Sequence, residues 1–223
     1  MKKLEIFGDS ILQGVIYSEE EKKYRLFSEN KFDSVTAQGV EVVNNARMGA
    51  TVEKGLSRMQ KALDVGSNTT VLLEFGGNDC DFDWGLISEN PEIEIEAKIP
   101  EKKFTALLAE AINYARSRGA DVAVATLIPI DAEKYMNWIS RNLNYNNILR
   151  WLGDVSMLSR WQEYYNRLVE ETASRLKCRI VDLRSTFLLS HSYKTMLCAD
   201  GIHPTEKGHA LIHDIISEFA LSN

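Results

Sequence analysis

Short apolar runs alternate along the chain with longer stretches in which apolar residues recur every three or four positions. The runs have the length of β-strands and cover residues 4–7, 40–44, 70–75, 122–127 and 179–183. Four of the five are almost continuously apolar, which is typical of strands buried on both faces of a sheet. The longer stretches have the spacing of amphipathic helices, at 52–63, 104–115, about 160–176 and after Thr205. This alternation predicts a three-layer α/β/α sandwich with a five-stranded, mainly parallel sheet.

Two stretches depart from this alternation. Residues 17–38 are too long and too charged for a tight connection, and we expect a short helix at about 32–37. Residues 130–159 form an insertion after the fourth strand, with more aromatic residues than a surface loop needs. Long loops in compact domains usually serve as lids or binding walls, so we expect a helical cap at about 130–159.

Composition narrows the class of protein. The 223 residues, 44% of them hydrophobic, suffice for one well-filled core, so residues 1–223 are expected to form a single domain. The formal net charge of −6 argues against nucleic acid as a partner, which needs a clustered basic surface. No apolar run approaches the roughly 20 residues of a membrane span. The start of the chain does not resemble a signal peptide, and the three cysteines are scattered, so a cytoplasmic location is expected.

Residues that could take part in a reaction follow the strands at their carboxyl ends. Ser10 stands directly after the first strand, at the sheet edge where open α/β folds bind ligands. Near the other end of the chain, Asp200 and His203 are three residues apart. A serine, a histidine and an aspartate can act as a nucleophile, its base and the group that orients the base. Taken alone, Ser10 is more typical of a turn or helix cap, and His203 of an ordinary surface histidine.

Two further segments contain groups that could stabilise a reaction intermediate. Gly76-Gly77-Asn78-Asp79 follows the most apolar strand, and the side-chain NH₂ of Asn78 can point at an oxyanion. Gly49 lies in a loop after the second strand, where a glycine can present its backbone N–H. The alternatives are an ordinary turn at Asn78 and a glycine that only relieves strain at Gly49.

A metal site is the alternative to a serine mechanism. Asp9, Asp79, Asp200 and His203 could bind a metal in a phosphoesterase-like arrangement. Such sites normally need several histidines, and only His203 stands in a strand-end loop. We therefore expect Asp9 and Asp79 to make hydrogen bonds that hold the strand-end loops.

Two other features have a structural and a chemical interpretation. His209 and His213 have the i, i+4 spacing of a zinc pair, but they lack an evident third ligand. We expect them on a solvated helix face. Cys80 follows the Asn-Asp pair without a paired histidine, so we expect a small, partly buried cysteine rather than a nucleophile.

Together, the four strand-end segments resemble the SGNH (GDSL-type) hydrolase family. Gly8-Asp9-Ser10 is similar to its first block, although Ile11 stands where the family's name has leucine. Gly49 resembles the glycine of the second block, residues 76–79 its Gly-x-Asn-Asp, and residues 200–204 its Asp-x-x-His-Pro. Order and approximate separation agree from residue 4 to the end of the sequence, so the resemblance covers essentially the whole chain.

The resemblance implies a flavodoxin-like SGNH hydrolase fold and a serine esterase that hydrolyses acyl or acetyl esters of small molecules. It implies Ser10 as the nucleophile, His203 as the base and Asp200 as the group that orients the base. It also implies an oxyanion hole from the N–H groups of Ser10 and Gly49 and the amide of Asn78. No metal and no organic cofactor are implied. A carbohydrate O-deacetylase with the same site and a noncatalytic ligand-binding protein are the alternatives, and the intact Ser/Asp/His set counts against the second.

The insertion bears on the size of the substrate. It leaves the fourth strand on the same side of the sheet as the serine. We expect Trp138, Tyr145 or Trp151 to form an apolar wall for the acyl or leaving group, unless these aromatics only pack helices onto the sheet. Asp81 and Asp83 are expected to make the pocket entrance acidic.

Overall fold

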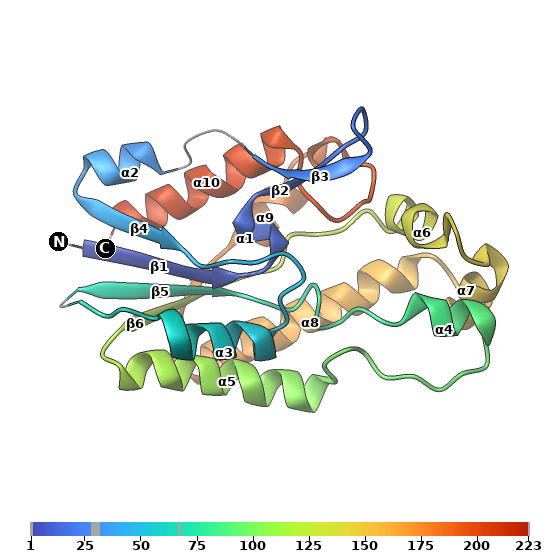
Figure 1. The fold of residues 1–223 in the computed structure, drawn as a ribbon, viewed down its shortest axis with the longest axis horizontal. Helices are drawn as coiled ribbons and strands as arrows, with labels where there is room; N and C mark the ends of the chain where they lie inside the picture. The colour runs from blue at the N-terminus through green and yellow to red at the C-terminus, as the bar shows by residue number, and fades with distance from the viewer. Residues whose placement is uncertain (1, 28–31, 67, 223) are drawn as a thin grey trace.

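The structure, a computed structural model, describes residues 2–27, 32–66 and 68–222. Five parallel strands form the central sheet in the order β4–β1–β5–β6–β7. Their bounds are β1 (Lys2–Gly8), β4 (Val40–Asn44), β5 (Thr69–Glu74), β6 (Asp121–Ala125) and β7 (Arg179–Val181). Helices cover both faces of this sheet (Figure 1), so the predicted fold class is confirmed.

Side chains alternate between the two faces of the sheet, as they do along any β-strand. Leu73 of β5 belongs to one buried core and its neighbour Leu72 to the other. Three helices cover the face of Leu73: α3 (Val52–Ala62), α5 (Glu101–Ser117) and α8 (Ser156–Arg175). Three others cover the face of Leu72: α2 (Asp33–Ala37), α9 (Leu183–Leu188) and α10 (Glu206–Leu221). The near-continuous apolar runs therefore reflect burial on both faces.

Two strands end two residues earlier than the apolar pattern predicts. β6 ends at Ala125 rather than at residue 127, and β7 ends at Val181 rather than at residue 183. Asp182 stops β7, because its carboxylate accepts a hydrogen bond from the Ser185 N–H at 2.9 Å and caps α9. The apolar residues that follow belong to buried loop and helix.

Residues 17–38 contain more structure than the sequence predicts. The expected short helix is present as α2. An antiparallel hairpin precedes it, formed by β2 (Val15–Ser18) and β3 (Lys23–Leu26). Lys22 in the turn has a φ of +50°, a left-handed conformation that no Gly or Asn marks in the sequence. The hairpin was missed for this reason.

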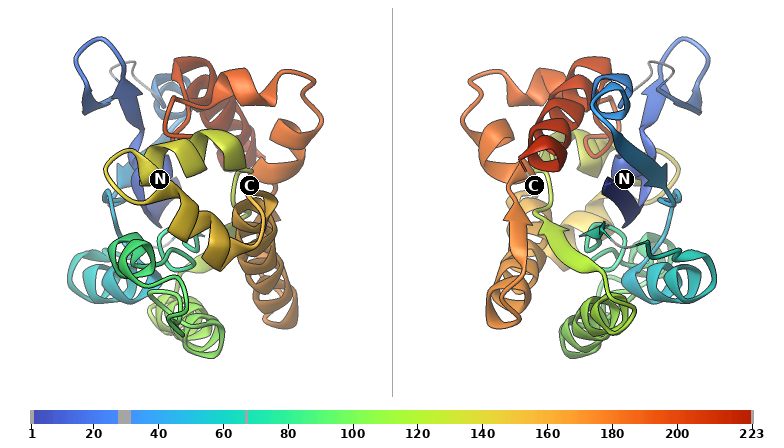
Figure 2. Two further views of the ribbon diagram at one scale, coloured as in Figure 1. Left: turned by 90° about the vertical axis from the view of Figure 1, so that its right-hand side faces the viewer. Right: turned by 90° about the vertical axis from the view of Figure 1, so that its left-hand side faces the viewer.

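Three helices lie beyond the carboxyl ends of the strands (Figure 1). They are α4 (Trp84–Glu89), α6 (Ala132–Ser140) and α7 (Tyr145–Leu152). Figure 2 shows α6 and α7 in yellow across this end of the sheet, away from the two chain termini. Within the described residues, no helix is both long and apolar enough to span a bilayer. The 130–159 segment is thus largely helical, and α8 begins within it at Ser156.

His209 and His213 contradict the expected solvated helix face. The exposed fraction is 0% for His209 and 8% for His213. His209 Nε2 lies 2.9 Å from the carbonyl oxygen of Val15, and both rings stack on Phe27. This face of α10 is buried because the hairpin and the residues after it pack against it.

Candidate active site

Ser10 is the first residue of the short helix α1 (Ser10–Gln13), which begins two residues after β1. Asp9 caps the helix, because its Oδ1 accepts a hydrogen bond from the Ile11 N–H at 2.8 Å. Gly8 permits a close approach to β5: a Cβ atom there would lie 3.1 Å from the carbonyl oxygen of Glu74. This tight turn holds Ser10 in a buried position at the carboxyl edge of the sheet.

Asp200 and His203 lie in the loop between the 3₁₀ helix η1 (Tyr193–Met196) and α10. Oδ1 of Asp200 accepts hydrogen bonds from the backbone N–H groups of Ile202 and His203, at 3.1 and 3.0 Å. Its Oδ2 lies 2.6 Å from His203 Nδ1, and His203 Nε2 lies 2.9 Å from Ser10 Oγ. A continuous series of hydrogen bonds therefore joins the three residues, although Ser10 stands near the start of the sequence and the other two near its end.

The electrostatics of the Asp200–His203–Ser10 hydrogen bonds favour an ionised Asp200. Burial opposes ionisation, but the hydrogen bonds from His203 and from the backbone outweigh it and hold the pKa of Asp200 below its usual value. An ionised Asp200 accepts the Nδ1–H of His203. That tautomer leaves Nε2 as an acceptor facing the Ser10 hydroxyl, which is the arrangement that proton abstraction requires.

Asn78 is tied to the same turn through Asp9. Its Nδ2 donates a hydrogen bond to Asp9 Oδ2 at 2.9 Å, while the other carboxylate oxygen caps α1. An amide nitrogen has two hydrogens, so this bond leaves Asn78 one more N–H to donate. Gly76 has a φ of +141°, and a Cβ there would lie 2.8 Å from Leu127, so the turn that positions Asn78 requires a glycine.

Gly49 lies in the loop between β4 and α3. Its φ is +71°, and two hydrogen bonds hold the loop against the first turn. The Arg47 N–H donates to the Gly8 carbonyl at 3.0 Å, and the Met48 N–H donates to Gln13 Oε1 at 2.6 Å. The structure thus brings Gly49 to the cavity that Ser10, Asn78 and His203 also line.

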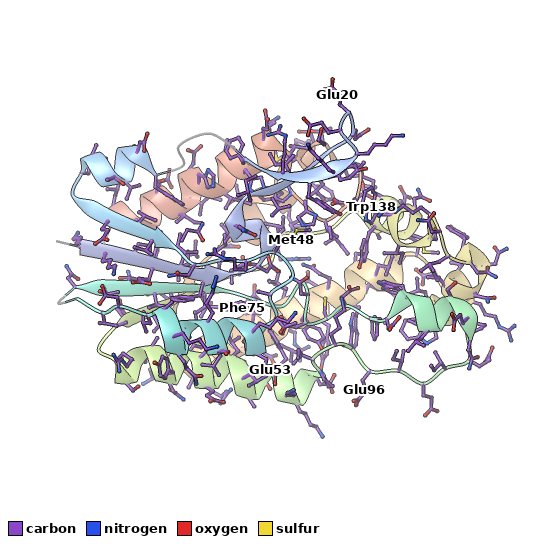
Figure 3. The ribbon with its side chains drawn as sticks, viewed as in Figure 1. Glu20, Met48, Glu53, Phe75, Glu96 and Trp138 are labelled. Atoms are coloured by element: carbon purple, nitrogen blue, oxygen red, sulfur yellow. The ribbon has the colours of Figure 1, made fainter. Side chains whose placement is uncertain are left out.

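This cavity has a volume of about 280 Å³. Residues of the strand-end loops line its polar part, and the segment after Asn78 and the helices α7 and α8 supply apolar walls. Met48 is 49% exposed, and Figure 3 shows it at the carboxyl edge of the sheet. Ser10 and the exposed Met48 thus line the same cavity.

Comparison with known proteins assigns the family. The model of the GDSL-like lipase/acylhydrolase family matches residues 6–211. The chain belongs to this family. Its members are hydrolases that act on esters, and the chain is accordingly a hydrolase of this kind. The search of curated proteins found no match to this sequence.

Solved structures of similar fold include family members from several bacteria. A lipase/acylhydrolase from Enterococcus faecalis has a TM-score of 0.69 and 21% identity, over 98% of this chain and 95% of that one. A GDSL-like lipase from Bacteroides thetaiotaomicron has a TM-score of 0.65 and 16% identity, over 99% and 88%. An acetylxylan esterase from Geobacillus stearothermophilus has a TM-score of 0.66 and 18% identity, over 98% and 94%. At these identities the likeness concerns the fold.

Two buried acidic residues of this GDSL-family chain, Glu74 and Asp9, lie beside the site. Glu74 is buried at the end of β5, and its Oε2 accepts a hydrogen bond from the Asp9 backbone N–H at 3.4 Å. Burial, and then the Asp9 carboxylate, hold the pKa of Glu74 well above its usual value. Burial also raises the pKa of Asp9. Sequence reasoning missed Glu74, although a carboxylate directly after the apolar run of β5 was the available sign.

Asp79 makes the kind of loop contact that the sequence predicts. Its Oδ1 accepts a hydrogen bond from the Val52 N–H at 2.9 Å, which ties the turn after β5 to the start of α3. Burial raises the pKa of Asp79 to about 7. Tyr24 of the unpredicted hairpin also reaches the cavity, with its ring centroid 5.0 Å from that of His203.

Of the two acids expected at the pocket entrance, Asp81 lines the cavity and Asp83 does not. Asp81 Oδ2 accepts a hydrogen bond from Lys98 Nζ at 2.7 Å, and Asp81 Oδ1 accepts bonds from Trp84 Nε1 and Tyr135 Oη. Asp83 caps α4 by accepting the Leu86 N–H. Both acids are thus engaged in structure, and the charge of Asp81 is compensated.

One of the three candidates for the expected aromatic wall lies at the cavity. Trp151 lines the cavity. Trp138 instead packs against Tyr17, with ring centroids 4.5 Å apart, and lies beside the hairpin in Figure 3. Tyr145 is 40% exposed and does not line the cavity. On amphipathic helices, only the residues that face the sheet edge can reach the cavity.

The other candidate chemistries find little geometric support. Among the described residues, no group of three or more His, Cys, Asp or Glu side chains is arranged to hold a metal ion. Cys80 is buried, and its Sγ donates to the Gly77 carbonyl. Burial raises the pKa of the Cys80 thiol well above its usual value, so the reactive thiolate is disfavoured.

Proposed function

We propose that the chain is a serine esterase that hydrolyses carboxylic esters through an acyl-enzyme. The observation that carries the proposal is the continuous hydrogen-bond chain Asp200–His203–Ser10 in the wall of a cavity. Each group has the partner that its role requires. The proposal covers residues 1–223 as one domain, with 130–159 as its cap.

The reaction follows from these positions. Oγ of Ser10 attacks the ester carbonyl carbon while His203 Nε2 takes the hydroxyl proton. The protonated His203 then gives this proton to the departing alcohol, and the acyl group remains on Ser10. Water attacks the acyl-enzyme with His203 again as the base, which releases the carboxylic acid and restores Ser10. Asp200 keeps its negative charge and stabilises the imidazolium in both steps.

The negative charge of each tetrahedral intermediate falls on the former carbonyl oxygen. The backbone N–H groups of Ser10 and Gly49 and the second N–H of Asn78 are the proposed donors to this oxygen. Fixed donors are effective because they need no reorganisation as the charge develops. The bond from Asn78 to Asp9 supports this role, because it restricts the rotation of the amide.

Covalent labelling tests the nucleophile. A fluorophosphonate should add once to the intact protein, and peptide mapping should place the label on Ser10. Ser10→Ala should abolish both the labelling and the hydrolysis of p-nitrophenyl acetate. Ser117→Ala, which changes an exposed serine at the end of α5, is the matched control and should retain both.

Three outcomes would refute the serine mechanism. Labelling that persists in Ser10→Ala but disappears in Cys80→Ser would assign the nucleophile to the thiol. Ester hydrolysis that EDTA abolishes and added metal restores would assign it to a metal site. A folded wild-type protein that neither takes the label nor hydrolyses any ester would favour the noncatalytic alternative.

A carbohydrate O-deacetylase is the second candidate. The acetylxylan esterase among the similar structures favours it, since the same fold there acts on an acetylated sugar polymer. Both candidates use the same hydrogen-bond chain and differ in what the cavity accepts. Acetylated xylo-oligosaccharides and p-nitrophenyl esters, compared by kcat/KM, separate the two.

A further inference from the structure

The cavity has an apolar part that the proposed chemistry does not use. Four aromatic rings line it: Phe82 and Trp84 from the segment after β5, Trp151 from α7 and Trp161 from α8. The ring centroid of Phe82 lies 4.9 Å from that of Trp151 and 5.6 Å from those of Trp84 and Trp161. We call these four residues the aromatic box.

The polar atoms of the aromatic box are already used within the protein. Trp84 Nε1 donates to the carboxylate of Asp81 at 2.8 Å. Trp151 and Trp161 donate to backbone carbonyl oxygens, at 3.0 and 2.8 Å. A molecule inside the box therefore meets hydrocarbon and ring faces, with no indole N–H left for it.

Two polar side chains beside the box are engaged in the same way. The hydroxyl of Tyr135 donates to Asp81 at 2.7 Å. Gln162 donates to the carbonyl oxygen of Ile128 at 2.9 Å and accepts a hydrogen bond from Arg184 at 3.0 Å. A sugar would lose its water partners here without replacing them, which is unfavourable. A hydrocarbon chain loses nothing, and each methylene it buries is worth about a fourfold factor in binding.

Polar groups suited to an ester lie in another part of the same cavity. Ser10 and Asn78 come from loops at the strand ends and His203 from the loop before α10, whereas the box comes from the segment after β5 and from α7 and α8. Figure 1 shows α7 well beyond α1, past the carboxyl ends of the strands. A bound ester therefore has its carbonyl at Ser10 and one substituent directed toward the helices.

We infer that the aromatic box is an acyl-chain site, which holds a straight chain of medium length while Ser10 attacks the carbonyl carbon. The inference rests on the proposed function. A cavity of about 280 Å³ has room for roughly nine water-sized groups, part of which the ester itself occupies. A hexanoyl or octanoyl chain fits this space, and a palmitoyl chain exceeds it. The alcohol extends past the exposed Met48 toward solvent.

The chain-length dependence of kcat/KM tests the site. The p-nitrophenyl esters of acetate, butyrate, octanoate and palmitate share one leaving group, so they differ only in the acyl chain. Octanoate should exceed acetate by about tenfold or more. Leu152→Phe adds volume to the cavity lining, and it should lower the octanoate value about tenfold while acetate changes by less than about twofold.

Tyr145→Ala is the matched control, because it changes an exposed ring on the same helix and should leave the profile unchanged. Ligand binding to Ser10→Ala tests the site without catalysis, so the test remains valid if Leu152→Phe is unstable. Three of the four box residues are tryptophans, so methyl octanoate should change the tryptophan fluorescence of the Ser10→Ala protein at saturable concentrations. Methyl acetate at equal concentration should not.

The outcomes distinguish this inference from the proposed function. If the fluorescence of Ser10→Ala responds to methyl octanoate but the wild-type protein hydrolyses no ester, the acyl-chain site is retained and the esterase is refuted. Hydrolysis through Ser10 that is fastest with acetate or with acetylated xylo-oligosaccharides, with no fluorescence response, would overturn the acyl-chain site alone. An octanoate preference that Leu152→Phe and Tyr145→Ala reduce equally would also overturn it.

Discussion

Asp79 offers a quantitative test of the electrostatics beneath the site. Its carboxylate is fully buried, and Oδ1 accepts the Val52 N–H at the start of α3. Burial raises its pKa to about 7, from the usual 3.8. The Asp79→Asn substitution keeps the acceptor for Val52 and mimics the protonated acid, which carries no charge. It therefore removes the titration with little change in shape.

The sign and size of the effect follow from linkage between protonation and folding. The folded state holds the Asp79 proton more tightly than the unfolded chain, so the contribution of Asp79 to stability is most favourable below the unfolded pKa of 3.8 and falls as the pH rises from there to about 7. A difference of about three pKa units corresponds to about 4 kcal/mol in the free energy of unfolding. About 2.5 kcal/mol of this loss falls between pH 5 and pH 8. Asp79→Asn should not show this loss.

Urea unfolding followed by circular dichroism, at pH 5 and pH 8, measures the effect. Other buried acids titrate in both proteins, so the relevant quantity is the change between the two pH values in the stability difference of variant and wild type. We expect this change to favour Asp79→Asn by about 2.5 kcal/mol at pH 8. Asp83→Asn, at an exposed helix cap, is the control. A stability difference for Asp79→Asn that is equal at the two pH values would refute the reasoning.

Substitutions at three further positions test the geometry around Ser10. Asn78→Ala should lower kcat about 100- to 1,000-fold with little change in KM or thermal midpoint; lost stability with a normal kcat per folded molecule would make Asn78 a turn residue. Gly201→Ala should lower both the midpoint and kcat, because φ is +76° and the new Cβ would lie 2.6 Å from the Asp131 carbonyl oxygen; unchanged values would contradict this. Glu74→Gln keeps an acceptor for the Asp9 N–H and should retain most of kcat, whereas Glu74→Leu should not; equal losses would refute the role of this bond.

The parallel sheet was predictable because burial on both faces leaves a direct mark on the sequence. Strands such as Thr69–Glu74 have no exposed face, so their apolar runs are nearly continuous. The β2–β3 hairpin has no such mark. Its strands are four residues long, β3 has no fully buried residue, and its turn contains a lysine at positive φ. The pairing depends on packing against α10, which is distant in sequence.

The core of the site was predictable for a topological reason. Parallel strands bring their carboxyl ends to one edge, so Ser10 and Asn78 had to approach each other once β1 and β5 paired. His203 was harder to place from topology alone, because its loop precedes a helix and follows no strand. Its place rested on resemblance to the family, and the geometry now shows it 2.9 Å from Ser10 Oγ.

The buried environment of the site was not predictable from residue spacing. Local pattern indicates that Asp81 carries a charge, but not that Lys98 lies 2.7 Å from it. It indicates that His209 and His213 share a helix face, but not that a hairpin covers that face. In each case the decisive partner belongs to a segment whose position the tertiary structure sets.

One segment connects the proposed chemistry with the proposed selectivity. Residues 76–84 contain Asn78, an expected oxyanion donor, and two members of the aromatic box, Phe82 and Trp84. Two hydrogen bonds fix the backbone in the middle of this segment. The Ile99 N–H donates to the Asp79 carbonyl at 3.0 Å, and the Trp161 indole donates to the Cys80 carbonyl at 2.8 Å. A change on α7 can alter the box without moving Ser10 or His203. A change that displaces α8 acts on Asn78 as well, because Trp161 contacts the backbone two residues further along.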